Sequence, residues 1–145
     1  MQSIVNLLIK GDKVLLGSDS QAPMGQVVAK GALTAAVVSA AGGVLKLQNT
    51  TGYDLYVELF MIDVTTKSTG VATLDIGVDS IGTTSNDSLI DGVDVSTAPI
   101  IASNVVGGGT NGKIVRWKKD EYIVATASAT VAGMVGTFTL KASAV

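Results

Sequence analysis

The fold is decided by one apolar stretch, Leu55-Tyr56-Val57-Glu58-Leu59-Phe60-Met61-Ile62-Asp63-Val64, which follows the turn Thr51-Gly52. Its β-branched and aromatic side chains are typical of a long strand. Alternation along a strand divides these side chains between two faces. One face holds Leu55, Val57, Leu59 and Met61, and the other holds Tyr56, Glu58, Phe60 and Ile62. Because both faces are apolar apart from Glu58, we predict a central strand covered on both sides, in which Leu59→Asp and Phe60→Asp both destabilise severely.

Short apolar runs bounded by Gly, Asn, Asp and Ser turns lie on either side of this strand. They occupy residues 44–49, 72–78, 89–95, 99–106, 114–117, 122–128 and 136–142. In the second run Leu74, Ile76 and Val78 share the inward face. About seven or eight short strands at regular spacing predict an all-β fold, an antiparallel β-sandwich of jelly-roll type.

The first part of the chain has a different pattern. Apolar runs at 4–9 and 14–16 flank a polar turn and predict a hairpin, and residues 26–29 fit a short strand. Residues 32–41 fit a helix through their alanines and a strand through Val37-Val38, and we favour the strand. We predict that residues 1–43 form an N-terminal arm or strand-exchange segment, and that residues 44–145 form a self-sufficient sandwich.

Composition excludes several classes of partner. The net charge is −2 and only Arg116, Lys118 and Lys119 form a basic cluster, so nucleic acid is not an expected partner. No apolar run approaches the ~20 residues of a membrane span, and the start of the chain lacks the positive region of an export signal. The chain is 47% hydrophobic and 15% charged, which favours a homo-oligomer.

Enzymatic motifs are incomplete. His and Cys are absent, which removes the usual bases and thiolate ligands. Residues 107–113 have the spacing of a phosphate-binding loop up to Lys113, but Ile114 replaces the hydroxyl residue that such a loop needs for Mg²⁺. Asp91 and Asp94 could in principle act as a carboxylate pair on glycosides, but their spacing is also ordinary in turns. We therefore expect no enzymatic activity and no cofactor, and we expect Lys113→Ala to leave function intact.

Two polar or aromatic groups remain as candidate binding residues. Five aspartates could supply oxygen ligands to a cation, although their spacing does not fit an EF-hand loop. They are Asp75, Asp79, Asp87, Asp91 and Asp94. Solvated turns account for them better, and no metal site is predicted. Four aromatic residues could form a stacking platform for sugars, or could pack against neighbouring strands, which we favour. They are Tyr53, Tyr56, Trp117 and Tyr122.

Several stretches resemble small structural proteins from the head-gene clusters of tailed bacteriophages. The first is Leu47-Gln48-Asn49-Thr50-Thr51-Gly52-Tyr53-Asp54-Leu55-Tyr56-Val57, which runs into residues 62–66 and 70–78. Residues 88–95, 109–113 and 130–137 extend the resemblance over about residues 44–142. The resemblance implies a virion component, a capsid decoration or cement protein, and it carries over no catalytic residues.

The sequence thus predicts a non-enzymatic decoration protein on the capsid surface. Its expected partners are further copies of itself, as a trimer, and the phage major capsid protein. Two alternatives remain. One is a receptor- or carbohydrate-binding tail or fibre module, which an exposed aromatic cluster around Trp117 would favour. The other is a self-assembling shell or tube protein, which would polymerise alone.

Overall fold

A computed structural model describes residues 7–10, 13–16, 26–35, 40–97, 99–106 and 114–144. These residues form strands and no helix, which confirms the predicted all-β class. The strands are β1 (Leu7–Lys10), β2 (Lys13–Leu16), β3 (Gln26–Ala32), β4 (Leu45–Gln48), β5 (Leu55–Thr66), β6 (Thr73–Asp79), β7 (Ile90–Asp94), β8 (Ile100–Ser103), β9 (Val115–Trp117), β10 (Tyr122–Ala127) and β11 (Val135–Ala144). The sequence located each of them to within a few residues.

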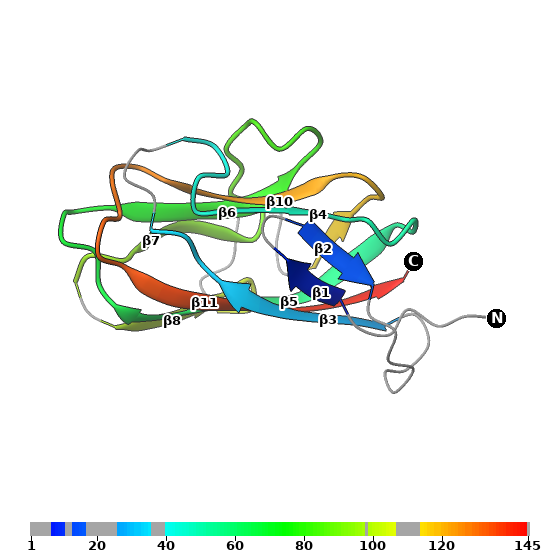
Figure 1. Ribbon diagram of the computed structural model, residues 1–145, viewed down its shortest axis with the longest axis horizontal. Coiled ribbons are helices and arrows are strands. Elements are labelled where there is room, and N and C mark those ends of the chain that lie inside the picture. The colour runs from blue at the N-terminus through cyan, green and yellow to red at the C-terminus, as the bar shows by residue number, and fades with distance from the viewer. Residues whose placement is uncertain are drawn as a thin grey trace.

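Two antiparallel sheets pack face to face (Figure 1). One sheet has the order β4-β10-β6-β7, and the other has the order β3-β11-β5-β8, with β9 also paired to β5. The pairs are nested along the chain: β3 with β11, β4 with β10, β5 with β8, and β6 with β7. An antiparallel sandwich in which eight strands are nested in this way is a jelly roll, as the sequence predicts; β9 is an additional short strand.

Strand β3 belongs to this sandwich, so the predicted boundary after residue 43 is wrong for this segment. β3 pairs with β11 from Ala32 opposite Thr137 to Gln26 opposite Ser143. The side chains of Val27 and Ala29 are buried in the core. The nested pairing requires a first strand beside the last one, and residues 44–145 alone cannot supply it. That the remaining N-terminal residues act as an arm stays a prediction.

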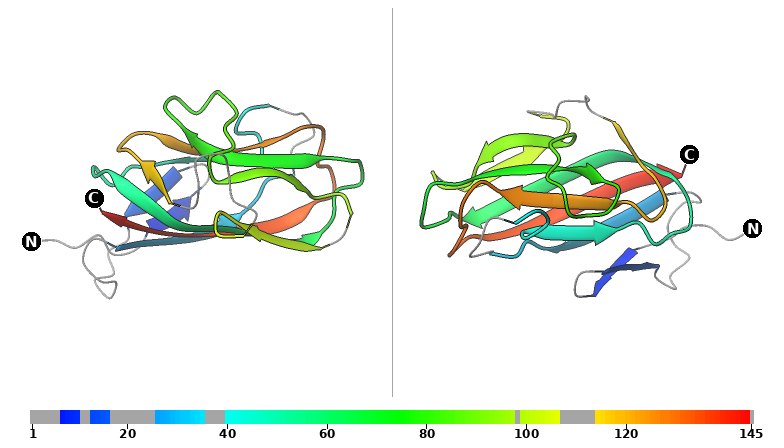
Figure 2. Two further views of the ribbon diagram at one scale, coloured as in Figure 1. Left: turned by 180° about the vertical axis from the view of Figure 1, so that it is seen from behind. Right: turned by 90° about the horizontal axis from the view of Figure 1, so that it is seen from above.

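The predicted N-terminal hairpin is present as β1 and β2. It forms a separate two-stranded sheet, with β1 beside β3 and β2 beside β4 (Figure 2, right). The hairpin therefore lies across the edge of the sandwich where β3 and β4 end the two sheets. The strand favoured for residues 32–41 is not formed beyond Ala32 in residues 33–35 and 40–41, and residues 36–39 lie outside the described residues.

The central strand β5 carries a β-bulge that the sequence pattern does not reveal. Its pairing with β11 shifts register between the partners of Val57 and Leu59. Val57 and Phe60 are therefore both buried, whereas Glu58 is exposed and Leu59 is half-buried. The expected faces are correct up to Val57. After Val57 the inward and outward faces are swapped relative to the expectation, because the bulge adds one residue to the alternation of side chains along the strand. The predicted cover on both sides is wrong: the outer face of β5 is partly open.

The core lies between the two sheets. Phe60 of β5 and Phe138 of β11 stack with ring centroids 5.7 Å apart, and Trp117 is fully buried. On β6, Leu74 and Ile76 are buried in this core, as predicted.

The loop between β6 and β7 folds over the outer face of the four-stranded sheet. Gly77 permits this approach, because a Cβ there would lie 2.6 Å from the backbone nitrogen of Ser88. Val124, which pairs with Gly77, is completely buried although it lies outside the core cluster between the sheets. The absence of a side chain at Gly77 therefore gives this sheet a partly covered outer face.

Candidate interaction surface

Exposed apolar side chains gather along one edge of the five-stranded sheet. Strands β8 and β9 both pair with the same side of β5, β8 with Met61–Val64 and β9 with Leu55–Val57. Four exposed side chains lie on β8 or on the residues that flank β8 and β9. They are Ile101, Val105, Val106 and Ile114, and we call them the β8 edge. Ile101 is 66% exposed. Exposed apolar side chains grouped along one edge are candidates for an interaction site.

Asn104 completes the side of β5 between β8 and β9. Its amide Oδ1 accepts a hydrogen bond of 2.7 Å from the backbone N–H of Phe60, and its Nδ2 donates one of 3.2 Å to the carbonyl of Glu58. Its own backbone N–H donates to the carbonyl of Phe60 at 3.2 Å. The buried side chain thus bonds to the backbone of β5 at the bulge as a neighbouring strand would. It also fixes where β8 ends and where Val105 and Val106 begin.

We expect Asn104→Ala to lower the free energy of unfolding by about 2–4 kcal/mol. It would remove the partner of the buried N–H of Phe60 and of the part-buried carbonyl of Glu58, and an unpaired buried group costs about 1–3 kcal/mol. Asn104→Asp should cost at least as much, because it buries a charge and sets a carboxylate oxygen against the carbonyl of Glu58. Urea unfolding measures the effect, with Val105→Ala at the exposed neighbouring position as the control. An Asn104→Ala protein as stable as this control would show that the bulge does not need the amide.

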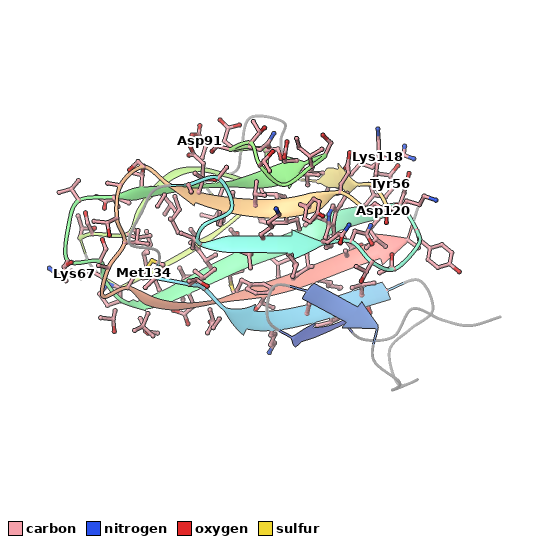
Figure 3. All side chains as sticks on the ribbon, turned by 45° about the horizontal axis from the view of Figure 1, so that its top comes forward. Tyr56, Lys67, Asp91, Lys118, Asp120 and Met134 are labelled. Carbon is pink, nitrogen blue, oxygen red and sulfur yellow. The ribbon has the colours of Figure 1, made fainter. Side chains whose placement is uncertain are left out.

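The structure does not bring the four candidate aromatic residues into one platform. Trp117 is buried in the core, and its Nε1–H donates to the carbonyl of Glu121 at 2.9 Å. Tyr122 lies on the outer face of the four-stranded sheet, where the Lys46 ammonium is 5.0 Å from its ring centroid. Tyr53 and Tyr56 are exposed, and Tyr56 lies at the same end of the molecule as Lys118 and Asp120 (Figure 3).

The polar side chains at this end of the molecule form hydrogen bonds and an ion pair within the chain. Asp54 accepts from the Arg116 guanidinium at 2.8 Å and from the backbone N–H of Lys119 at 3.0 Å. The N–H of Lys119, followed by Arg116, lowers the pKa of Asp54. Because the pKa of Asp54 is lowered, its ionised carboxylate stabilises the folded loop at pH values above the ordinary pKa of an aspartate. That contribution is lost as the pH falls through the folded-state pKa. The basic cluster predicted from Arg116, Lys118 and Lys119 is thus partly neutralised within the chain.

The candidate aspartates Asp75, Asp79, Asp91 and Asp94 lie in β6 and β7, not in the predicted turns, and three of them accept hydrogen bonds from backbone N–H groups. Asp75 accepts a hydrogen bond from the backbone N–H of Gly92, and Asp94 accepts one from the backbone N–H and one from the hydroxyl of Ser96. Asp79 accepts from the backbone N–H groups of residues 82–84. Desolvation opposes ionisation of Asp79, but these donors outweigh it and lower its pKa. Within the described residues no three acidic side chains are grouped so that they could hold a metal ion.

The phosphate-loop candidate, residues 107–113 with Lys113, lies outside the described residues. No described helix is long and apolar enough to cross a membrane. No protein-family model, curated protein or solved structure matches this chain. The β8 edge was not singled out from the sequence, although Asn104 within an uncharged apolar run was a visible signal.

Proposed function

We propose that this protein is a non-enzymatic structural component of a tailed-phage virion. In this role it binds the outside of the capsid as a decoration or cement protein. Its binding partners there are the major capsid protein and further copies of itself. The resemblance of residues 44–142 to head-cluster proteins supports the capsid as its location. Jelly rolls occur in viral capsid and lectin domains, so the fold is compatible with this role without selecting it.

The observation that carries the proposal is the β8 edge. A decoration protein needs a surface that binds other proteins, and the exposed Ile101, Val105 and Val106 offer apolar area for such contacts. A protein that binds the assembled shell better than its free subunits stabilises the shell. Several weak contacts on one oligomer add up through avidity.

A carbohydrate- or receptor-binding module is the second candidate, and the exposed Tyr53 and Tyr56 favour it. Two exposed tyrosines can stack on a sugar face. The largest aromatic side chain, Trp117, is however buried in the core. An aromatic cluster around Trp117 is the feature that would favour this module, and burial removes its central member.

Quantitative mass spectrometry of purified virions tests the proposal. The phage that carries the gene is separated into capsid and tail fractions, and the copy number of this protein is measured against that of the major capsid protein. We expect many copies, all in the capsid fraction. Absence from virions would overturn the proposal, and recovery in the tail fraction would replace it with the tail or fibre module. Adding Tyr53→Ala and Ile101→Lys proteins to stripped capsids separates the two surfaces: only Ile101→Lys should weaken binding.

A further inference from the structure

The edge strands of the described sandwich differ in charge. Each of four edge strands contains at least one charged side chain: Lys30 in β3, Lys46 in β4, Asp91 and Asp94 in β7, and Arg116 in β9. Strand β8 contains none, and no charged residue occurs between Asp94 and Lys113. Charged residues on edge strands prevent pairing with other chains. The β3 and β4 edge also has the hairpin of β1 and β2 beside it (Figure 2). Among the described residues, strand β8 itself has neither form of protection.

The backbone of β8 has groups that point away from β5. The N–H of Asn104 donates to the carbonyl of Phe60, and the register continues with Ala102 opposite Ile62. In an antiparallel ladder, alternate residues direct their N–H and C=O groups to opposite sides. Ile101 and Ser103 therefore direct theirs away from β5, where no other strand of the described sheets pairs with β8.

We propose that β8 pairs antiparallel with β8 of a second copy of this chain, about a twofold axis at Ala102. In this register Ile101 lies opposite Ser103 of the partner subunit, and each such pair exchanges two backbone hydrogen bonds. The pairing joins the two five-stranded sheets into one continuous sheet. The proposal uses the same β8 edge as the proposed capsid role, but it concerns contacts between copies of this chain.

Charge identifies the second copy as the occupant. Antiparallel self-pairing of β7 would bring Asp91 and Asp94 of the two copies together, and self-pairing of β3 or β4 would bring lysines together. Self-pairing of β8 opposes no like charges, and the net charge of −2 per chain adds little repulsion. A twofold contact uses the same edge on both copies and closes on itself. The resulting dimer differs from the trimer expected from the sequence.

A cysteine at the axis tests the register, because the native chain has no cysteine. Residues opposite each other in a non-hydrogen-bonded antiparallel pair have Cα atoms about 4.5 Å apart, within the range of a disulfide. Ala102→Cys treated with diamide should therefore form a covalent dimer. The control is Val71→Cys, at a position that is 84% exposed and lies in the turn between β5 and β6, outside the edge strands. Crosslinking of Ala102→Cys no faster than of this control would overturn the proposal.

Sedimentation of Ile101→Lys provides a second measurement. In this register the two lysines would lie on the same face of the joined sheet, two residues apart across the twofold axis, so the dimer dissociation constant should rise by at least about tenfold. Val71→Lys adds the same charge elsewhere and should leave the constant unchanged. An unaltered constant for Ile101→Lys, or a trimer in both variants, would overturn the β8 pairing. Because both experiments use the purified chain alone, they can fail while the capsid proposal survives, and the reverse also holds.

Discussion

Deletion of residues 1–40 should unfold the β domain, whereas deletion of residues 1–25 should leave it folded. The longer deletion removes β3, and with it the buried side chains of Val27, Ala29 and Leu33. Burial of a Val or Leu side chain contributes about 1.5–3 kcal/mol. The lost ladder with β11 adds about 0.5–1.5 kcal/mol for each hydrogen bond. Together these losses approach the roughly 5–15 kcal/mol that stabilises a whole domain.

Circular dichroism and thermal unfolding of the two truncated proteins measure this difference. The shorter deletion also tests the arm prediction, since it removes the hairpin of β1 and β2 but keeps β3. We expect it to fold and to assemble or bind capsids more weakly. A cooperative unfolding transition for the protein lacking residues 1–40 would contradict the place of β3 in the sandwich. Undiminished assembly of the protein lacking residues 1–25 would leave the arm without a role.

Phe60→Asp should prevent folding, while Leu59→Asp should change stability by no more than about 1 kcal/mol. Phe60 is fully buried and stacks on Phe138, so an aspartate there would be an unpaired buried charge. Leu59 is half-buried on the outer face and lies opposite Lys141, so an aspartate there would face an opposite charge. This outcome differs from the sequence-based expectation that both substitutions are severe.

Urea unfolding of the two single variants measures the contrast between neighbouring positions. Leu59→Asn and Phe60→Leu are matched controls, since one is polar without charge and the other is apolar with altered shape. We expect only small changes for Leu59→Asn and a loss of about 1–3 kcal/mol for Phe60→Leu. Equal severity of Leu59→Asp and Phe60→Asp would contradict the partly open outer face and would support a β5 covered on both sides.

Local sequence patterns were sufficient to predict the strands but not the bulge. Turn residues and alternating apolar side chains are local signals, and they predicted the hairpin and most strand positions well. At the bulge in β5, the amide of Asn104, a residue distant in sequence, bonds to the backbone of Glu58 and Phe60. Alternation alone assumes one residue per step, so the pattern after Val57 was assigned to the wrong face.

The domain boundary and the interaction surface were missed for related reasons. The need for β3 arises from nested pairing with the far end of the chain, which no local signal in residues 26–32 reveals. Isoleucine is common in strands, so the sequence alone does not distinguish Ile101 from a core residue. Only the observed pairing of β8 shows that its side chain faces outward. The aspartates were assigned to turns because Asp side chains commonly accept from nearby backbone N–H groups, yet Asp75, Asp79, Asp91 and Asp94 lie in β6 and β7.

We infer that this jelly roll associates through strand β8. Hydrogen–deuterium exchange, compared between the monomer and the self-associated protein, tests this inference directly. Amides without a hydrogen-bond partner exchange fast, and pairing protects them. We predict that assembly slows exchange in a peptide covering residues 100–106, through the amides of Ile101 and Ser103. Exchange in β3 and β4 should stay unchanged. Unaltered exchange at residues 100–106, with new protection at β3 and β4 instead, would contradict the account.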